Sequence, residues 1–592
     1  MKSTIRHFLL ALNFLLAGPA VLSQTPTVSP VTDAMLAEPP AGEWLNWRGN
    51  AGAWGYSDLD QVNVDNVSRL QLVWSWAMDD TGGIEAAPLM HDGVLFLPGP
   101  RGVIQALDAA SGDLLWEFRP GITPVLEGSD ARHLGPTLAP EAVIPADAFT
   151  ACCRGVQKNI AIYQDRIFAA TENASIVAID VHTGHLVWEQ PVADPAEGFF
   201  YVAGPIIANG TLVTGISGCT RYRAEGGCFI TGHDPDTGAE RWRFNTIAQP
   251  GTPGGDTWDG LPAEFRAGSD AWIAGTYDAA RNLVYWGTAQ AKPWVREVRG
   301  TEDAALYTNS TLALNPDSGE LAWYYQHIPG ETLDMDEVFE NILVNIDGIP
   351  SLFKMGKLGI LWQLDRETGE FVSATDIGYQ NVIDVDPVSG AVRYRDGMIP
   401  RMGQQLDICP STSGFKSWRA MAYSPQSRAM YIPLTLNCAQ VTFGPVEMVV
   451  GGGGAGPMRR SNYQFPGADG NNGEMLALNI PDGSVKWRYR QRATMNSAAL
   501  TTAGGLVFVG DWDRYFYAFD AEQGAILWKT RLTTSVHGFP ISYAIDGRQY
   551  IAVPAGVGGA SWSTQLPRQL SPEIRRPAGG NSIHVFALPE EP

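Results

Sequence analysis

Two pairs of residues stand out because their spacing allows particular chemistry. Asp334 and Asp336 lie two residues apart in the segment WYYQHIPGETLDMDE, and Cys152 and Cys153 are adjacent in the chain. Hard cations take oxygen ligands and bind more tightly as ligand charge rises, so the two aspartates are candidate metal ligands, with a solvated acidic turn as the alternative. A disulfide between neighbouring cysteines closes a small strained ring, which suits a functional site. Pairing of each cysteine with a distant partner is the alternative.

The charge and composition of the chain limit the classes of protein to which it can belong. Its 592 residues include 41 basic and 63 acidic side chains, a net charge of −22, so a nucleic acid is not an expected partner. With 45% hydrophobic and 18% charged residues, the chain is typical of a water-soluble globular protein. The sequence contains no CxxCH motif, so no attached c-type haem is expected.

The N-terminus predicts export. A basic start is followed by an apolar run over 8–22 and then by small and polar residues, which is typical of a secretory signal peptide over residues 1–23. A membrane anchor is the alternative, but the run is short for a spanning helix and is interrupted by polar and helix-breaking residues. Residues 24–43, rich in Pro, Thr and Ala, predict a flexible leader. No stable membrane insertion is expected of the mature chain, whose cysteines should form disulfides in an oxidising compartment.

A repeated segment sets the expected fold. Its form is a small residue, an apolar residue, Asp or Asn, a turn ending in Gly, and a Trp four residues after that Gly. The copies are ALDAASGDLLW, AIDVHTGHLVW, GHDPDTGAERW, ALNPDSGELAW, ALNIPDGSVKW, AFDAEQGAILW and the weaker QLDRETGEFV.

Each copy predicts two strands joined by a tight turn, with Gly where φ is positive and a Trp that packs between neighbouring sheets. Further short strands precede most copies, and four strands make a propeller blade. The strands LVWSWA and SIHVFAL, near the two ends of the chain, could share one more blade. We therefore expect an all-β, eight-bladed β-propeller over residues 44–592. Two stacked sandwiches would not explain the constant Trp offset.

The chain resembles the pyrroloquinoline quinone (PQQ) dependent alcohol dehydrogenases. The resemblance begins at NWRGNAGAWGYSDLDQVNVDNVSRLQLVWSW and runs through essentially the whole mature chain. The segment CCRGVQKNIAIY aligns with a family pattern that carries a disulfide between neighbouring cysteines, here Cys152 and Cys153. A structural disulfide of the family matches Cys409 and Cys438, which leaves Cys219 and Cys228 to close a local loop.

The resemblance also implies a cofactor site. PQQ is a flat quinone with three carboxylates, and it needs an aromatic floor and cationic or hydroxyl partners. Trp272 lies eighteen residues before Gln290, the family spacing between the stacking Trp and a metal ligand, so it is the expected floor. The remaining positions that match cofactor contacts are Glu85, Lys158, Ser217, Gly218 and Lys357. Lys158 stands where the family has Arg. Its ammonium can bind a carboxylate as a point charge, but without the two parallel hydrogen bonds that an arginine donates.

The implied metal site departs from the family pattern. Asp334 matches the catalytic base and metal neighbour, and Asp336 matches a second Asp found in the lanthanide-using branch. Gln290 replaces the usual Asn ligand, and its amide oxygen can still bind a hard cation. Where the family has a metal-binding Glu, this chain has Cys219 and Thr220, and Glu225 is the candidate for that role. The metal expected is one calcium or lanthanide ion.

These matches predict a periplasmic enzyme that oxidises an alcohol to a carbonyl compound with PQQ and a metal ion. Because no haem is attached, the reduced cofactor would pass its electrons to a separate acceptor, such as a cytochrome c. The unusual ligand loop leaves bulky alcohols, polymers and sugars open as substrates. A non-catalytic propeller that acts as an assembly or interaction scaffold is the alternative function; it would keep the Trp repeats, but has no reason to keep the site motifs together.

Overall fold

The computed structural model describes residues 27–78, 82–121, 155–223, 227–559, 561–577 and 579–590. Within them the chain forms eight successive sheets of four antiparallel strands, and the seventh sheet gains a fifth, parallel strand. The all-β prediction is therefore confirmed, and strands such as β4 and β8 fall on the short apolar runs that precede the Trp repeats.

Each of the first five sheets takes its strands from one stretch of chain. They are β3 (Leu89–His91), β4 (Val94–Pro98), β5 (Ile104–Asp108) and β6 (Leu114–Phe118); β7 (Ala161–Tyr163), β8 (Arg166–Ala170), β9 (Ser175–Asp180) and β10 (Leu186–Pro191); β11 (Ile206–Ala208), β12 (Thr211–Gly215), β13 (Phe229–His233) and β14 (Glu240–Asn245); β16 (Thr276–Asp278), β17 (Leu283–Gly287), β19 (Ser310–Leu314) and β20 (Leu321–Gln326); and β21 (Ile342–Ile346), β22 (Ile349–Met355), β23 (Ile360–Asp365) and β24 (Phe371–Asp376).

The sixth sheet also takes its strands from one stretch of chain, whereas the last two each add a strand from the N-terminal part of the chain. The strands of these three sheets are β28 (Ala422–Ser424), β29 (Ala429–Thr435), β32 (Gly473–Asn479) and β33 (Val485–Gln491); β34 (Leu500–Thr502), β35 (Leu506–Gly510), β36 (Tyr515–Asp520) and β37 (Ile526–Arg531), extended by β1 (Tyr56–Ser57); and β38 (Ile541–Ile545), β39 (Arg548–Ala555), β40 (Ser582–Ala587) and β2 (Gln71–Ala77). Insertions add the small sheets β15–β18 (Ala267–Gly268, Ala291–Lys292), β25–β26 (Ile383–Val385, Val392–Tyr394) and β27–β30–β31 (Gln405–Ile408, Asn437–Phe443, Met458–Gln464).

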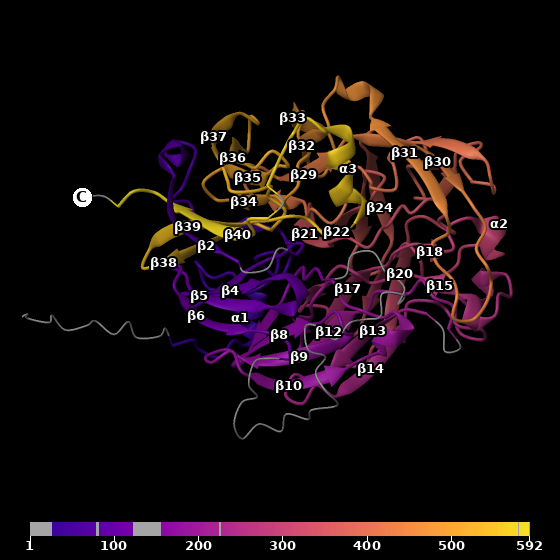
Figure 1. Cartoon of the computed structure of the whole chain (residues 1–592), viewed down its shortest axis with the longest axis horizontal. Helices are drawn as coiled ribbons and strands as arrows, with labels where there is room; N and C mark the ends of the chain where they lie inside the picture. Colours follow the sequence, from indigo (N-terminus) through magenta and orange to yellow (C-terminus); the bar gives the residue numbers. More distant parts are fainter. Residues whose placement is uncertain are drawn as a thin grey trace, which may run out of the picture.

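The two ends of the chain meet in one sheet. The sequence colours run around the molecule in Figure 1, and the yellow C-terminal strands lie beside the indigo strand β2. β2 pairs antiparallel with β40, with Trp74 opposite Val585 and Trp76 opposite Ile583. The expectation that LVWSWA and SIHVFAL share a sheet is confirmed, and this pairing covers edges that each strand would otherwise expose.

The repeated Trp residues join neighbouring sheets, as their spacing predicts. Trp116, on the last strand of its sheet, donates its indole N–H to the Val181 carbonyl at 2.9 Å and packs over Gly184 in the next sheet. A Cβ on Gly184 would lie 2.5 Å from the Trp116 ring, so this glycine serves both the positive φ of the turn and the close approach of the indole. The same pair of contacts recurs at Trp74, Trp188, Trp242 and Trp487.

One end of the ring of sheets carries the loops that matter for function. In each four-stranded antiparallel sheet, the start of the first strand lies beside the end of the second, so the segments that precede one and follow the other meet at the same end. These segments also bond to one another between sheets: the Ala87 N–H donates to the Lys158 carbonyl, and the Lys158 N–H to the Val202 carbonyl, both at 2.9 Å. Side chains from several sheets can therefore converge there.

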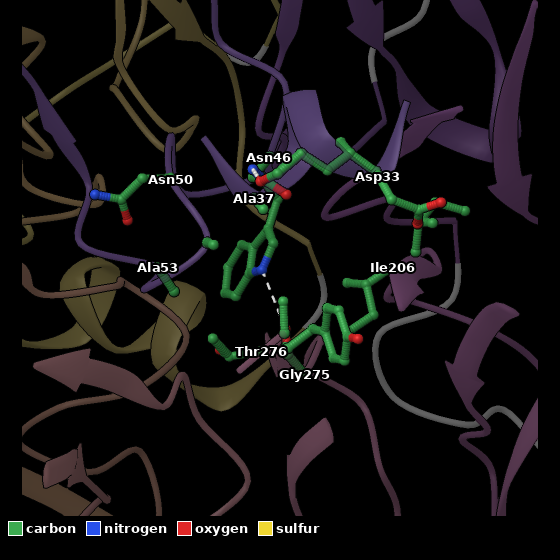
Figure 2. Close-up of a pocket in the computed structure, with 14 residues that line it drawn as sticks. Asp33, Ala37, Asn46, Asn50, Ala53, Ile206, Gly275 and Thr276 are labelled. Carbon is green, nitrogen blue, oxygen red and sulfur yellow. Dashed lines mark hydrogen bonds between the residues drawn. The ribbon is translucent and has the colours of Figure 1, made fainter. Parts of the chain in front are cut away.

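The expected flexible leader is wrong for residues 27–43. Val28 and Val31 are buried, and Val31 bridges to Gln164. The short helix α1 (Asp33–Ala37) buries Leu36, and Asp33 accepts a hydrogen bond from Tyr163 at 2.7 Å. Figure 2 shows Asp33 and Ala37 of α1 near Ile206 and Thr276, at a small cavity of about 40 Å³. The apolar residues dispersed among the prolines account for this packing.

The other helices are short. α2 covers Arg296–Arg299, and α3 covers Trp562–Leu570 in the connection between β39 and β40. No helix in the described part of the chain combines the length and apolar character needed to cross a bilayer.

Candidate active site

A cavity of about 250 Å³ opens among the loops at the end of the ring described above. Every sequence-predicted site residue within the described ranges lines it: Glu85, Lys158, Ser217, Gly218, Trp272, Gln290, Asp334, Asp336 and Lys357. These residues lie before the first strand or after the second strand of five sheets, so the antiparallel order of the strands brings them together.

Acidic and amide groups form one side of the cavity. The Gln290 side-chain N–H donates to Asp334 Oδ1, while Lys357 Nζ lies 3.2 Å from the same oxygen and 2.8 Å from Asp336 Oδ2. Burial raises the pKa of Asp334 well above its ordinary value, although Lys357 opposes this rise. The pKa of Lys357 is raised because Asp334 and Asp336 outweigh the effect of burial.

The loop that carries Asp334 is held in an unusual conformation. Asp334 has a φ of +65°, in the left-handed region that few residues other than glycine and asparagine occupy. The buried Glu331 carboxylate accepts the N–H groups of Leu333 at 2.5 Å and of Asp334 at 3.2 Å. On the other side, Asn309 donates to the Met335 carbonyl at 2.5 Å. These contacts fix the direction of the Asp334 carboxylate, as a positioned proton acceptor requires.

Two indoles and a buried ion pair form another side of the cavity. Trp272 is half-buried because it opens onto the cavity, and Phe339 packs edge-on against it at 5.4 Å. Lys158 pairs with Glu85, and its ammonium lies 5.5 Å from the Trp272 ring and 4.8 Å from the Trp418 ring. Sequence reasoning did not single out Trp418, although its position between the matched Cys409 and Cys438 was an available signal.

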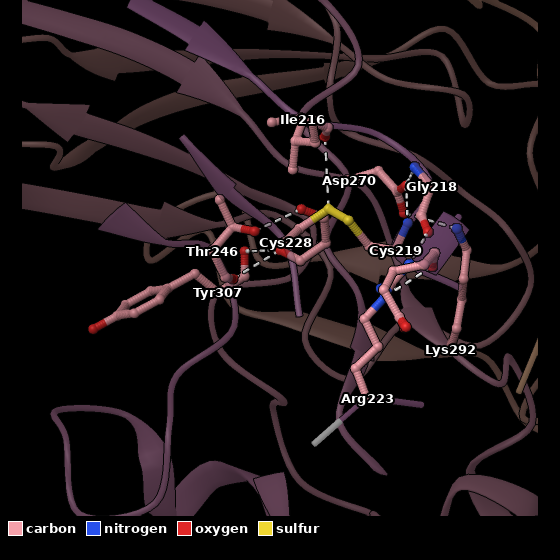
Figure 3. The surroundings of a disulfide bond; sticks show 12 residues. Ile216, Gly218, Cys219, Arg223, Cys228, Thr246, Asp270, Lys292 and Tyr307 are labelled. Carbon is pink, nitrogen blue, oxygen red and sulfur yellow. Dashed lines mark hydrogen bonds and ion pairs between the residues drawn. A yellow bond between two sulfur atoms is a disulfide. The ribbon is translucent and has the colours of Figure 1, made fainter. Parts of the chain in front are cut away.

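A second buried ion pair was also missed. Asp270 Oδ1 accepts the N–H groups of Gly218 at 2.8 Å and Cys219 at 3.0 Å, and Oδ2 lies 2.8 Å from Lys292 Nζ (Figure 3). Although burial acts to raise it, the pKa of Asp270 is lowered by Lys292 and by these N–H donors. Gly218 must be glycine, because its φ is +89° and a Cβ would lie 2.0 Å from the Gly198 carbonyl oxygen. A lysine within AQAKPW, two residues after a predicted ligand, was the signal for this pair.

Two of the three predicted disulfides lie in the described part of the chain. The disulfides Cys219–Cys228 and Cys409–Cys438 are both present, and Figure 3 shows the first beside Gly218 and Asp270. Cys152 and Cys153 lie outside the described residues, as do Glu225 and the expected signal peptide over 1–23.

The polar atoms of the cavity fit a hard cation and an anionic ring ligand. Within the described part of the chain, Gln290 Oε1, Asp336 Oδ1 and Thr220 Oγ1 are buried without a hydrogen-bond partner, and all three residues line the cavity. Oxygen atoms of this kind are the ligands that calcium and lanthanide ions prefer. The half-buried indole of Trp272 offers an aromatic face, and Ser217 Oγ is also unpartnered. Buried polar atoms normally have partners, so this cluster calls for a ligand.

Comparison with known proteins agrees with this geometry. Indoles, lysines and carboxylates line one cavity of this all-β ring of sheets, and the family model "PQQ: Glucose/ethanol/alcohol dehydrogenase, beta-propeller domain" matches residues 44–382 and 470–551. A quinohemoprotein alcohol dehydrogenase, ADH IIB of Pseudomonas putida, is 30% identical over 93% of this chain and 78% of its own. The quinoprotein alcohol dehydrogenase PedH of Pseudomonas putida is 29% identical over 90% of this chain and 89% of its own.

A solved structure extends the comparison. A europium-containing methanol dehydrogenase superposes with a TM-score of 0.84 at 25% identity, covering 94% of this chain and all of its own. The chain belongs to the family of PQQ-dependent alcohol dehydrogenases, which are oxidoreductases, and its fold is the PQQ β-propeller of that family.

Proposed function

We propose that this protein oxidises an alcohol to an aldehyde or ketone, using PQQ and one calcium or lanthanide ion bound in the cavity. One observation carries the proposal: residues from five sheets, chosen from the sequence, line a single cavity in which Gln290 Oε1 and Asp336 Oδ1 are buried and unpartnered. The alternative of a non-catalytic scaffold gives no reason for that convergence.

The side chains have distinct parts in the reaction. Asp334 would accept the proton of the substrate hydroxyl, and the Glu331 contacts to Leu333 and Asp334 keep its carboxylate directed into the cavity. Lys357 and the Gln290 amide contact the same carboxylate, so they set its charge and orientation. Asp334, Lys357 and Gln290 are buried, which strengthens each of these electrostatic contacts.

The cofactor and the cation would be held by groups that the cavity already presents. When bound, PQQ supplies an electrophilic quinone carbon that accepts two electrons, and the cation polarises its carbonyl group. Trp272 would stack on the ring, while Glu85, Lys158, Ser217 and Gly218 would contact its edge. Gln290, Asp334 and Asp336 would bind the cation; Cys152, Cys153 and Glu225 remain proposed contributors.

The proposal extends to the whole chain. Residues 1–23 would direct export to the periplasm, and residues 44–592 would form one propeller whose eight four-stranded sheets are its eight blades. An external acceptor such as a cytochrome c would take up the electrons, and the names of the relatives support this: one is "1-butanol dehydrogenase (cytochrome c)" of Thauera butanivorans.

A reconstitution experiment tests the function. The purified protein would be mixed with PQQ and either calcium or a light lanthanide, and the reduction of an artificial dye would be followed with a panel of alcohols. We expect alcohol-dependent dye reduction that requires both PQQ and a metal. Failure to bind PQQ with either metal would contradict the proposal and favour a scaffold.

The same assay tests the metal ligands. Because Asp336 adds a negative charge to the ligand set, Asp336→Ala should lose lanthanide-supported turnover more than calcium-supported turnover. Equal losses, or equal calcium and lanthanide rates in the unaltered enzyme, would count against a lanthanide role for Asp336.

A further inference from the structure

We propose that Lys292 is a cofactor-binding residue, whose ammonium binds a carboxylate of the quinone while Asp270 holds it in place. This inference rests on the proposed function, because it names a further residue of the same site. Lys292 lies on β18, two residues after Gln290, and lines the cavity. Figure 3 shows its side chain extending toward Asp270 beside the Gly218 loop.

Asp270 is fully engaged, whereas Lys292 is not. One Asp270 oxygen accepts two backbone N–H groups and the other accepts Lys292 Nζ at 2.8 Å. Among the described residues, Asp270 supplies the one acceptor within hydrogen-bonding distance of this ammonium. An ammonium has three donors, so two of them remain for a ligand in the cavity. Since buried donors without partners are costly, an anionic acceptor there would be favoured.

The other lysines of the cavity are less available. Lys357 Nζ already has three acceptors: Asp334 Oδ1 at 3.2 Å, the Asp334 carbonyl at 2.7 Å and Asp336 Oδ2 at 2.8 Å. Lys158 pairs with Glu85 and lies against two indole rings. Of the three ammonium groups that line the cavity, Lys292 therefore has the geometry best suited to receive a carboxylate.

The charge balance of the cavity gives a second argument. Glu85, Asp270, Asp334 and Asp336 contribute four carboxylates, against the three ammonium groups of Lys158, Lys292 and Lys357. In the absence of the cation, a cofactor with three carboxylates would enter a site whose side chains are formally negative by one charge. Removal of Lys292 would leave four carboxylates against two ammonium groups. The penalty should therefore fall on the acidic cofactor, and it should disappear for an uncharged analogue of the same shape.

A purely structural role makes a different prediction. The Asp270–Lys292 pair also connects β18 to the Gly218 loop, so its loss could loosen the site for any ligand. The test therefore compares PQQ with its trimethyl ester, which keeps the ring but has no carboxylate. Binding would be measured by quenching of tryptophan fluorescence, with and without calcium.

We expect Lys292→Met to weaken binding of PQQ at least tenfold and binding of the ester less than twofold. Lys292→Arg, which keeps the charge, should bind PQQ within about threefold of the unaltered protein. Lys292→Gln keeps a donor for Asp270 without the charge, and it should behave as Lys292→Met. The exposed Lys529→Met is the matched control and should change neither affinity.

Three results separate the possibilities. Unchanged PQQ affinity in Lys292→Met and Lys292→Gln would overturn the inference, and so would equal losses for PQQ and ester. If Lys292→Met does not fold, the inference is tested by comparing the PQQ affinities of Lys292→Gln and Lys292→Arg. Failure of the unaltered protein to bind PQQ would instead overturn the proposed function.

Discussion

Asp334 shows how a single residue can be fixed for one task. Its backbone adopts a positive φ, its N–H is bound by Glu331, and its carboxylate contacts both an amide and an ammonium group. A non-glycine residue in this region is strained, and such strain persists only where the surroundings impose it. The positive φ of Asp334 therefore lowers the folding stability somewhat, while it directs the Asp334 carboxylate into the cavity.

Asparagine can replace Asp334 without disturbing this backbone, because it also tolerates positive φ. We expect Asp334→Asn to lower kcat about 10²- to 10⁴-fold, the range for loss of a general base, with unchanged thermal stability. Asp347→Asn is the matched control, since Asp347 has a φ of +50° but is exposed. Steady-state dye reduction and calorimetry would measure the effects, and full activity in Asp334→Asn would show that another group accepts the proton.

His537 makes a pH-dependent contribution to stability. It is buried beside Trp418, its Nδ1 lies 2.9 Å from the Gly556 carbonyl, and its Nε2 lies 3.0 Å from the Asn496 amide. Burial, with repulsion from nearby arginines, lowers its pKa well below 6.5. Below pH 6.5 the unfolded chain therefore binds more protons at this site than the folded chain, and the free energy of unfolding falls as the pH falls.

Replacement of this histidine should remove that dependence. His537→Gln should lower stability at pH 7.5, but relative to the unaltered protein it should gain up to about 1.4 kcal/mol for each pH unit below 6.5. Urea denaturation at pH 7.5, 6.5 and 5.5 would measure this, with the exposed His182→Gln as control. Parallel stability curves for His537→Gln and the unaltered protein would contradict the expected shift.

At the level of the elements, a repeated Trp and Gly join neighbouring sheets at five junctions, those of Trp74, Trp116, Trp188, Trp242 and Trp487. The Trp buries a large apolar area and donates one hydrogen bond, while the Gly leaves room for the ring. Because the bond always runs to the residue three positions before the glycine, the contact sets the relative position of neighbouring sheets.

A pair of glycines isolates the value of this contact. Gly184 and Gly93 have φ values of +72° and +77°, so alanine is strained at both, but only Gly184 lies against an indole. Gly184→Ala should destabilise the protein by about 1–3 kcal/mol more than Gly93→Ala, because its Cβ would displace the Trp116 ring. Chemical denaturation would measure the difference. Equal effects would mean that the ring moves aside without cost.

The sequence was most informative where a contact depends on local spacing. The Trp and Gly offsets predicted the hairpins and the contacts between sheets, and the pairing of strands near the two ends followed from counting strands. The site residues came from motifs, and the antiparallel order of each sheet explains why they meet. The position of Lys292 two residues after Gln290 was the one signal for the Asp270–Lys292 pair, which was missed because the contact between the two side chains depends on the fold. The leader was misjudged because a few apolar residues suffice to anchor a proline-rich segment to a large surface.

At the scale of the whole molecule, the last strand completes the ring. β40 lies between β39 and β2, and Ile583, Val585 and Phe586 on it are buried. Burial of three such side chains contributes roughly 5–9 kcal/mol, which is comparable with the entire stability of a typical domain. The pairing with β2 also determines the environment of the cavity, because Glu85 lies in the loop that follows β2 and accepts the N–H of Gly559, in the loop that precedes β40.

Deletion of residues 582–592 should therefore disrupt folding and cofactor binding together. We expect the truncated protein to lose its cooperative thermal transition and to bind PQQ at least tenfold more weakly, because β2 and β39 would keep unpaired edges. A synthetic peptide of residues 579–592, added in excess, should restore the transition, since the strand binds along two edges. The same peptide with Ile583→Asp and Val585→Asp should not, because its charges would enter the core. Calorimetry of the truncated protein, with and without each peptide, would measure the transition. If the truncated protein showed a cooperative transition without any peptide, the remaining sheets would be stable without the strand that joins the two ends of the chain.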